Sequence, residues 1–282
     1  MPPDRALTPD GLVVALYDLG GEGPPALLVH ATGFHARVLA PLADNLGTHF
    51  HCLALDLRGH GESAVPEDLN FDWVGFGTDV LTAVDALGLE SPLGIGHSCG
   101  GASLLLAEQA QPGTFSALYC FEPVIVAPGA STTPNPSDAL AQGARQRREV
   151  FSSRRDAYAN YASKPPLDTL HPDVLAAYVA FGFEDLPDGS VRLRCRGENE
   201  ALMYEGGLCH PGFSRLDAVE CPVVIACGAN SRSFTPADFE PVVQRLAKGR
   251  LEILSGLGHF GPLEQPSLVA DSVIRDLDAP PA

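Results

Sequence analysis

A serine between two glycines is the feature of this sequence that most directly suggests chemistry. Ser98 lies in the run GIGHSCGG, flanked by Gly96 and Gly100. A serine hydroxyl attacks a carbonyl group only when a base removes its proton. A histidine can be that base, and a carboxylate can hold the imidazole in the tautomer it needs. The rest of the sequence therefore has to supply a histidine and an acid that the fold can bring to Ser98.

The residues around Ser98 favour a nucleophile over a hydroxyl in a loop of small residues. The run 92–98 has the apolar pattern of a buried strand, and 100–110 has the pattern of a helix. In G-x-S-x-G between a strand and a helix, the turn is so tight that a Cβ on either flank would clash. The serine is then held in a strained conformation that directs its hydroxyl away from the sheet. A simple loop would explain the serine but not the two elements.

Strand-like and helix-like segments alternate along most of the chain. Short Val-, Leu- and Ile-rich runs are typical of strands buried on both faces, and several are followed by helical spacing. Such repeated units predict an α/β fold with a mostly parallel sheet covered on both faces by helices. The loosely alternating run 12–20 is expected to be an edge strand. The remaining predicted strands are 26–30, 51–57, 92–98, 115–123, 221–229 and 249–256.

Residues 124–216 interrupt this alternation. They begin with a Pro-rich stretch and continue through an Arg-rich helical segment (139–164) and a second helix (171–183). The run DLPDGSVRLRC at 185–195 predicts a hairpin. We interpret them as an inserted, mainly helical cap over the carboxyl edge of the sheet. The core would then consist of residues 1–123 and 217–282.

Four sequence motifs in a fixed order resemble the α/β-hydrolase family. The runs LLVHATGFH (27–35) and DLRGHGES (56–63) precede the serine motif, and GLGHFGPLEQP (256–266) follows it near the end of the chain. The resemblance covers nearly the whole chain. It implies the α/β-hydrolase fold, with a mostly parallel eight-stranded sheet, helices on both faces and an inserted cap, and it implies no metal or organic cofactor.

The same resemblance assigns the base to His259, one of nine histidines. His259 follows a predicted strand in a Gly-rich loop and precedes the last helix, where the family carries its base. His97, next to Ser98, should point to the opposite face and serve in packing or hydrogen bonding. His30 and His60 correspond to family positions that are usually structural.

The acid is where this sequence departs from the commonest family pattern. Many relatives carry Asp three residues after the glycine that ends the next-to-last strand, but here that glycine is Gly228 and the position is Ser231. A subset of lactonase- and esterase-like members instead has the acid after the strand that follows the serine, where this chain has Glu122. A charged residue at the end of an apolar strand is costly unless it is paired. We therefore expect Glu122 to orient His259; Asp238, or no acid at all, are the alternatives.

The oxyanion of a tetrahedral intermediate needs two hydrogen-bond donors. One would be the backbone N–H of Cys99, directly after the serine. The second would come from the early loop at Thr32, where Ala31 replaces the family's usual glycine. The thiol of Cys99 is expected to be inert.

These residues predict a serine hydrolase that cleaves a carboxylic ester or lactone through an acyl-enzyme. The rival interpretations are a C–C bond hydrolase or cofactor-free peroxidase with the same three residues, and a non-catalytic ligand-binding protein.

The predicted cap contains six aromatic residues and a cluster of five arginines. The aromatics could line an apolar pocket, although at least half should form the cap's own core. The arginines should form a solvated helix face; the alternative is that they bind a carboxylate group of the substrate. The aromatics are Tyr158, Tyr161, Tyr178, Phe181, Phe183 and Tyr204, and the arginines are Arg145, Arg147, Arg148, Arg154 and Arg155.

Composition limits the partners. The net charge of −17 argues against a nucleic-acid or anionic-membrane surface, and no run of 18 apolar residues or signal-peptide pattern occurs. Seven cysteines without a C-x-x-C motif predict buried thiols in a reducing cytoplasm. The expected protein is a monomer or homodimer acting on a small molecule.

Overall fold

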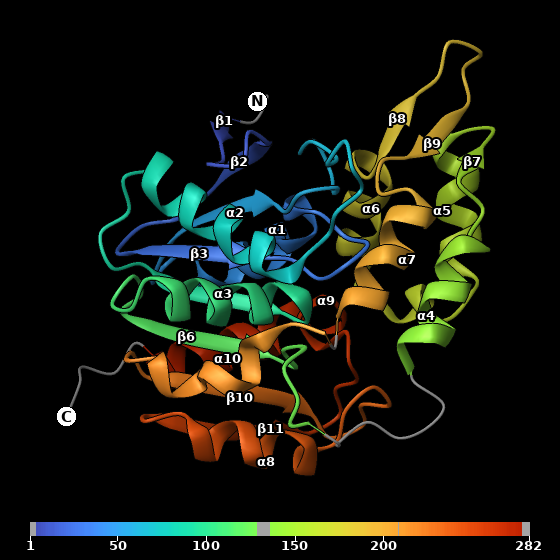
Figure 1. Cartoon of the computed structure of the whole chain (residues 1–282). Coiled ribbons are helices and arrows are strands. Elements are labelled where there is room, and N and C mark those ends of the chain that lie inside the picture. The colour runs from blue at the N-terminus through green and yellow to red at the C-terminus, as the bar shows by residue number, and fades with distance from the viewer. Residues whose placement is uncertain (1–3, 129–135, 208, 278–282) are drawn as a thin grey trace.

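The computed structural model describes residues 4–128, 136–207 and 209–277, and its main element is an eight-stranded sheet (Figure 1). The strand order is β1-β2-β4-β3-β5-β6-β10-β11. The six strands from β4 to β11 run parallel, and β1 and β2 are antiparallel to their neighbours. The strands are β1 (Asp4–Leu7), β2 (Val13–Gly20), β3 (Pro25–Val29), β4 (His51–Asp56), β5 (Leu93–His97), β6 (Ala117–Phe121), β10 (Val223–Gly228) and β11 (Gly249–Leu254).

This sheet confirms the predicted α/β-hydrolase architecture, with one correction at the edge. β2 is not an edge strand, because β1 pairs with it on its outer side, from Asp4 opposite Leu16 to Leu7 opposite Val13. The loose alternation of 12–20 reflects burial of its middle residues between β1 and β4. The central β3, β5 and β6 are almost wholly buried, as continuous apolar runs predict.

Helices cover the two faces of the sheet and enclose separate apolar cores. One core packs α1 and α10 against the sheet, and the other packs α2, α3 and α8 against the opposite face. Asp72 caps α2 by accepting a hydrogen bond from Val74 N–H at 3.1 Å. These helices are α1 (Ala40–Leu46), α2 (Trp73–Ala86), α3 (Cys99–Ala110), α8 (Pro236–Arg245) and α10 (Pro266–Leu277), with the short α9 (Gly261–Glu264) before α10.

The segment after β6 forms a second group of elements at one end of the main strands (Figure 1). A three-stranded antiparallel sheet, ordered β7-β9-β8, accompanies four helices. The hairpin pattern at 185–195 corresponds to β8 and β9, whereas β7 interrupts the segment predicted to be helical at 139–164. The elements are α4 (Pro136–Arg145), β7 (Val150–Phe151), α5 (Arg154–Ala162), α6 (Pro172–Phe181), β8 (Phe183–Asp185), β9 (Val191–Leu193) and α7 (Gly197–Gly206), with 3-10 turns at Leu167–Thr169 and Pro211–Ala218. A further 3-10 turn, Ala36–Leu39, precedes α1 in the main fold.

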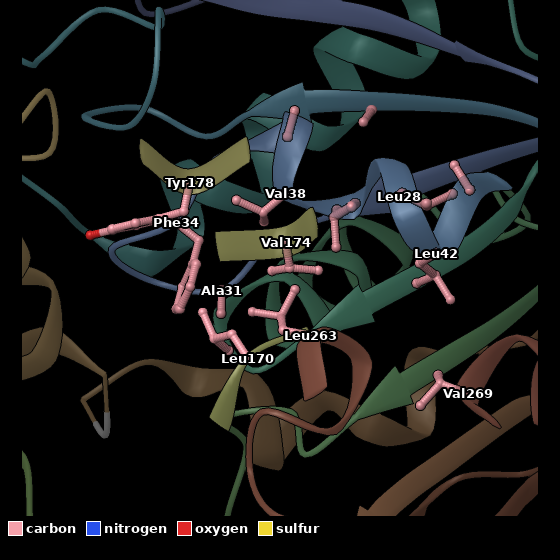
Figure 2. Packing of buried hydrophobic residues seen from close by; sticks show 14 of the residues in the cluster. Leu28, Ala31, Phe34, Val38, Leu42, Leu170, Val174, Tyr178, Leu263 and Val269 are labelled. Atoms are coloured by element: carbon pink, nitrogen blue, oxygen red, sulfur yellow. The ribbon is translucent and has the colours of Figure 1, made fainter. Parts of the chain in front are cut away.

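Part of this second group shares a core with the main sheet. Figure 2 shows Val174 and Tyr178 of α6, with Leu170 before it, packed among residues of the main fold. Their neighbours there include Ala31, Phe34, Val38 and Leu263. The boundaries at 124 and 216 stay a prediction, and residues 129–135 and 208 within that segment, like 1–3 and 278–282 in the predicted core, lie outside the described residues.

Candidate active site

Ser98 lies at the sharp turn between β5 and α3, with φ of 54° and ψ of −114°. A non-glycine residue with positive φ is strained. The flanking glycines permit the turn, because a Cβ on Gly96 would lie 2.6 Å from the Gly100 backbone and one on Gly100 would lie 2.2 Å from the Val29 carbonyl oxygen. The strained serine between two obligatory glycines has the geometry expected of a nucleophile elbow.

Glu122 follows β6, the strand next to β5, and its side chain is fully buried. Its φ of 44° makes it a second strained residue, although its backbone N–H still donates to the Ala226 carbonyl of β10 at 2.8 Å. The carboxylate accepts three hydrogen bonds: from His259 Nδ1 at 2.6 Å, from the Ser231 hydroxyl at 2.8 Å and from the Gly228 N–H at 2.9 Å. A buried carboxylate is tolerated only with such compensation.

His259 reaches Glu122 from the loop between β11 and α9. Its side chain is 17% exposed, and the rings of Phe234 and Phe260 lie 5.8 and 5.4 Å from its ring centre. Because Nδ1–H donates to the carboxylate, Nε2 is left as the nitrogen able to accept a proton. This is the tautomer that a general base acting on a serine requires.

Hydrogen bonds to the main chain connect the segments that carry Ser98, Glu122 and His259. The Ser98 N–H donates to the Phe121 carbonyl at 2.9 Å, so the serine and the acid are on adjoining strand ends. His97 Nε2–H donates to the His259 carbonyl at 2.8 Å, and the two rings are 5.1 Å apart. No hydrogen bond joins the Ser98 hydroxyl to the imidazole among the described residues. Such bonds are commonly long without substrate and tighten when it binds.

Two backbone N–H groups near Ser98 are available as oxyanion donors. In the described part of the chain, neither the Thr32 N–H nor the Cys99 N–H donates a hydrogen bond. The neighbouring Gly33 N–H is not available as a donor, because it already donates to His60 Nε2 at 3.0 Å. Burial raises the pKa of the Cys99 thiol to about 12, so the thiol stays protonated near neutral pH.

Three other histidines near the site are buried and structural. His30 Nδ1–H donates to the Ala31 carbonyl at 2.8 Å and its Nε2 accepts from Leu57 N–H at 3.1 Å. Burial lowers the pKa of His30 and of His60 to about 3. Burial, together with the adjacent His259, lowers the pKa of His97 well below its ordinary value. All three are therefore neutral at pH 7.

Asp238 lies in the first turn of α8, and no described hydrogen bond joins it to His259. Its carboxylate accepts from the Thr235 N–H and hydroxyl, both at 2.7 Å, in a capping box. Ser231 has no carboxylate, but its hydroxyl contacts Glu122. Sequence reasoning missed this contact, although the motif comparison had singled out the position.

The arginine cluster is divided in the structure, which corrects the expectation of one solvated face. Arg147 turns inward, pairing with Glu200 and donating to the Tyr178 hydroxyl at 2.5 Å. The Glu200 carboxylate lies against the loop that follows β3, since a Cβ on Gly33 would be 2.7 Å from its Oε1. The chain leaves α4 after Arg145, so helical periodicity does not apply to Arg147.

The six predicted aromatics divide into three groups, of which one is Tyr204 alone, packed against a separate small cluster of Ala141, Ala144 and Ala201. Tyr161, Tyr178 and Phe183 are buried together in the shared core, whereas Tyr158 and Phe181 are 37% and 42% exposed. The rings beside His259 come instead from Phe234 and Phe260, which the sequence analysis did not select. Among the described residues, no three His, Cys, Asp or Glu side chains are grouped as metal ligands would be.

Known proteins provide an independent comparison. Residues 26–272 match the family model described as "Alpha/beta hydrolase family". Protein phosphatase methylesterase 1 of Homo sapiens is 39% identical over 94 residues, which cover 31% of this chain and 24% of that protein. The matched segment is thus about a quarter of the length of that relative.

Solved structures share the fold. The structure of E-2-(acetamidomethylene)succinate hydrolase has a TM-score of 0.86 at 20% identity and covers 98% of this chain and 99% of its own. The enol-lactonase from Burkholderia xenovorans LB400 has a TM-score of 0.75 at 19% identity, over 98% of this chain and 100% of its own. With the family model covering most of its length, this chain belongs to the α/β-hydrolase family.

Proposed function

We propose that the protein is a serine hydrolase that cleaves a small to medium carboxylic ester or lactone. The observation that carries the proposal is the 2.6 Å hydrogen bond between His259 Nδ1 and the buried Glu122, formed next to the strained turn at Ser98. A methylesterase and an enol-lactonase among the similar proteins act on the two proposed bond types by name.

The proposed reaction has two acyl-transfer steps. The Ser98 hydroxyl attacks the carbonyl carbon while His259 Nε2 takes its proton, and the resulting oxyanion accepts hydrogen bonds from the N–H groups of Cys99 and Thr32. His259 then protonates the leaving alcohol. Water, deprotonated by the same imidazole, attacks the acyl-enzyme, and the acid is released as Ser98 regains its proton. Glu122 stabilises the imidazolium, and the steps require no metal or organic cofactor.

The surroundings support an apolar acyl or alcohol group. Phe234 and Phe260 flank the imidazole, and aromatic walls favour apolar ligands. The net charge of −17 supports a small-molecule substrate rather than nucleic acid. In the part of the chain that the structure describes, no helix combines the length and apolar composition needed to cross a membrane. All seven cysteines are free thiols, as in proteins of a reducing compartment, and the proposal includes a cytoplasmic location and a monomer or homodimer.

The variant Ser98→Ala tests the proposal. We expect it to lower kcat for p-nitrophenyl acetate hydrolysis by about 10⁶-fold and to abolish labelling by a fluorophosphonate, because no hydroxyl remains to attack. Its thermal denaturation midpoint should match that of the unmodified protein. Ser116→Ala, at an exposed serine, is the matched control and should keep full activity. Labelling that persists in Ser98→Ala, or is absent from the unmodified protein, would contradict a serine hydrolase.

A further inference from the structure

Ser231 donates a hydrogen bond to Glu122, the carboxylate that also binds His259. Ser231 follows a different strand from those that precede Ser98 and Glu122. It lies three residues beyond Gly228, the last residue of β10. Its hydroxyl is 2.8 Å from Glu122 Oε2. The same oxygen accepts the hydrogen bond from His259 Nδ1 at 2.6 Å. Ser231 and His259 therefore share one acceptor atom.

The direction of the Ser231 hydrogen bond is fixed by its surroundings. The Ser231 oxygen accepts weak hydrogen bonds from the N–H groups of Ser233 at 3.3 Å and Phe234 at 3.4 Å. An ionised carboxylate can only accept, so the hydroxyl proton must point to Glu122. The 231–234 turn consequently orients the donor, and its Phe234 ring lies against the imidazole.

The two oxygens of Glu122 are held by different groups. The Gly228 N–H donates to Oε1 at 2.9 Å, which leaves Ser231 and His259 on Oε2. Two other titratable groups interact with this site: Cys227, whose pKa is raised to about 11 by burial and then by Glu122, and the neutral His97, beside His259. Neither contributes a described hydrogen bond to the carboxylate, so Ser231 is the only side-chain hydroxyl that fixes Oε2 against His259 among the described residues.

We propose that Ser231 is a positioning residue that acts on catalysis through Glu122. Its hydroxyl keeps Oε2 directed at His259 Nδ1 and supplies part of the compensation that a buried carboxylate needs. Ser231, at the position where many family members carry Asp, thus supports Glu122, which follows the neighbouring strand. This inference rests on the proposed function, because it requires Glu122 to orient the base.

A double-mutant cycle on Ser231 and Glu122 tests this role. The readout is the second-order rate of Ser98 labelling by a fluorophosphonate, which needs no knowledge of the natural substrate. Ser231→Ala should lower this rate about tenfold, the usual effect of losing a hydrogen bond to a charged group. In the Glu122→Gln background the same change should alter the rate by less than about twofold, because no carboxylate remains to be positioned.

Two further variants separate positioning from a structural effect. Ser231→Thr keeps the hydroxyl and should restore most of the rate, and Ser233→Ala, at the exposed neighbour in the same turn, should leave it unchanged. A full rate in Ser231→Ala, an equal loss in both backgrounds, or no recovery in Ser231→Thr would overturn the positioning role while leaving the proposed function intact. A full rate in Glu122→Gln would instead remove the acid from the proposed function.

Discussion

At the scale of single residues, the candidate site holds two of the four non-glycine residues with positive φ among the described residues. Ser98 and Glu122 both have positive φ, at 54° and 44°, and such conformations cost about 1–3 kcal/mol each. They persist because neighbouring groups hold them: the Ser98 N–H donates to Phe121, and Glu122 is bound at its own N–H and at both carboxylate oxygens. The strain directs both side chains to the end of the sheet, where His259 lies.

The identity of the acid can be tested at this scale. Glu122→Gln should lower kcat for p-nitrophenyl acetate by about 10⁴-fold, because the neutral amide cannot stabilise the imidazolium or impose the required tautomer. Asp238→Asn should leave kcat unchanged and lower the free energy of unfolding by only about 0.3–1 kcal/mol, because the amide oxygen can still accept from Thr235 and only the negative charge near the α8 N-terminus is lost. Steady-state kinetics and urea denaturation of both variants measure the two effects. The reverse pattern would move the acid to α8.

Sequence order was sufficient to select Ser98, His259 and Glu122, because each occupies a recognisable place relative to a strand or helix. It was not sufficient for Ser231, whose contact with Glu122 joins residues 109 apart in the chain. Arg147 was assigned to the wrong environment for a related reason. Whether its side chain faces solvent or Glu200 depends on where α4 ends, and composition does not reveal that.

At the scale of elements, the close approach of α3 to β3 sets the position of the serine. Gly100, in the first turn of α3, has no side chain, and the Val29 carbonyl of β3 fills the space a Cβ would need. The helix can therefore begin directly after the serine, with the Cys99 N–H left without a described acceptor.

This packing predicts a severe effect of Gly100→Ala. The added carbon would lie 2.2 Å from a backbone oxygen, so β3 or α3 must shift; we expect a loss of about 1–3 kcal/mol in the free energy of unfolding, together with loss of the proposed hydrolysis of p-nitrophenyl acetate. Gly143→Ala is the matched control, because it lies in the exposed face of α4 with nothing within 4 Å of the new atom. It should be neutral or stabilising by up to about 1 kcal/mol. Urea denaturation followed by circular dichroism distinguishes the two, and equal stability would contradict the tight approach.

The elements that the sequence predicted well are those whose own residues are buried. β3, β5, β6 and β10 are continuous apolar runs, and their strand character follows from burial on both faces. β1 and β7 were not predicted. They have four and two residues, and only pairing with β2 and β9 makes them strands.

At the scale of the whole molecule, buried neutral histidines make the free energy of unfolding depend on pH. His30 and His60 lie between the ends of β3 and β4, with ring centres 4.8 Å apart. Their pKa of about 3 in the folded state is below the ordinary value of 6.5. Between these values the unfolded chain binds a proton that the folded protein does not. Stability is therefore full above pH 6.5 and falls as the pH decreases toward 3.

We expect each of these histidines to lower the free energy of unfolding by about 1.4 kcal/mol per pH unit below 6.5. The urea midpoint should therefore fall steeply from pH 6.5 to 4.5. His60→Gln, which can keep a donor and an acceptor, should make this slope shallower. A slope that His60→Gln leaves unaltered would show that other groups cause the acid sensitivity.

The burial of the cysteines has a practical consequence. Six of the seven thiols are buried, including the one beside the candidate nucleophile, and Cys209 on the outer surface is exposed. A maleimide dye or spin label would therefore attach at one known point without prior mutagenesis. That point follows α7, so such a label would report on the group of elements after β6 while Ser98 stays unmodified.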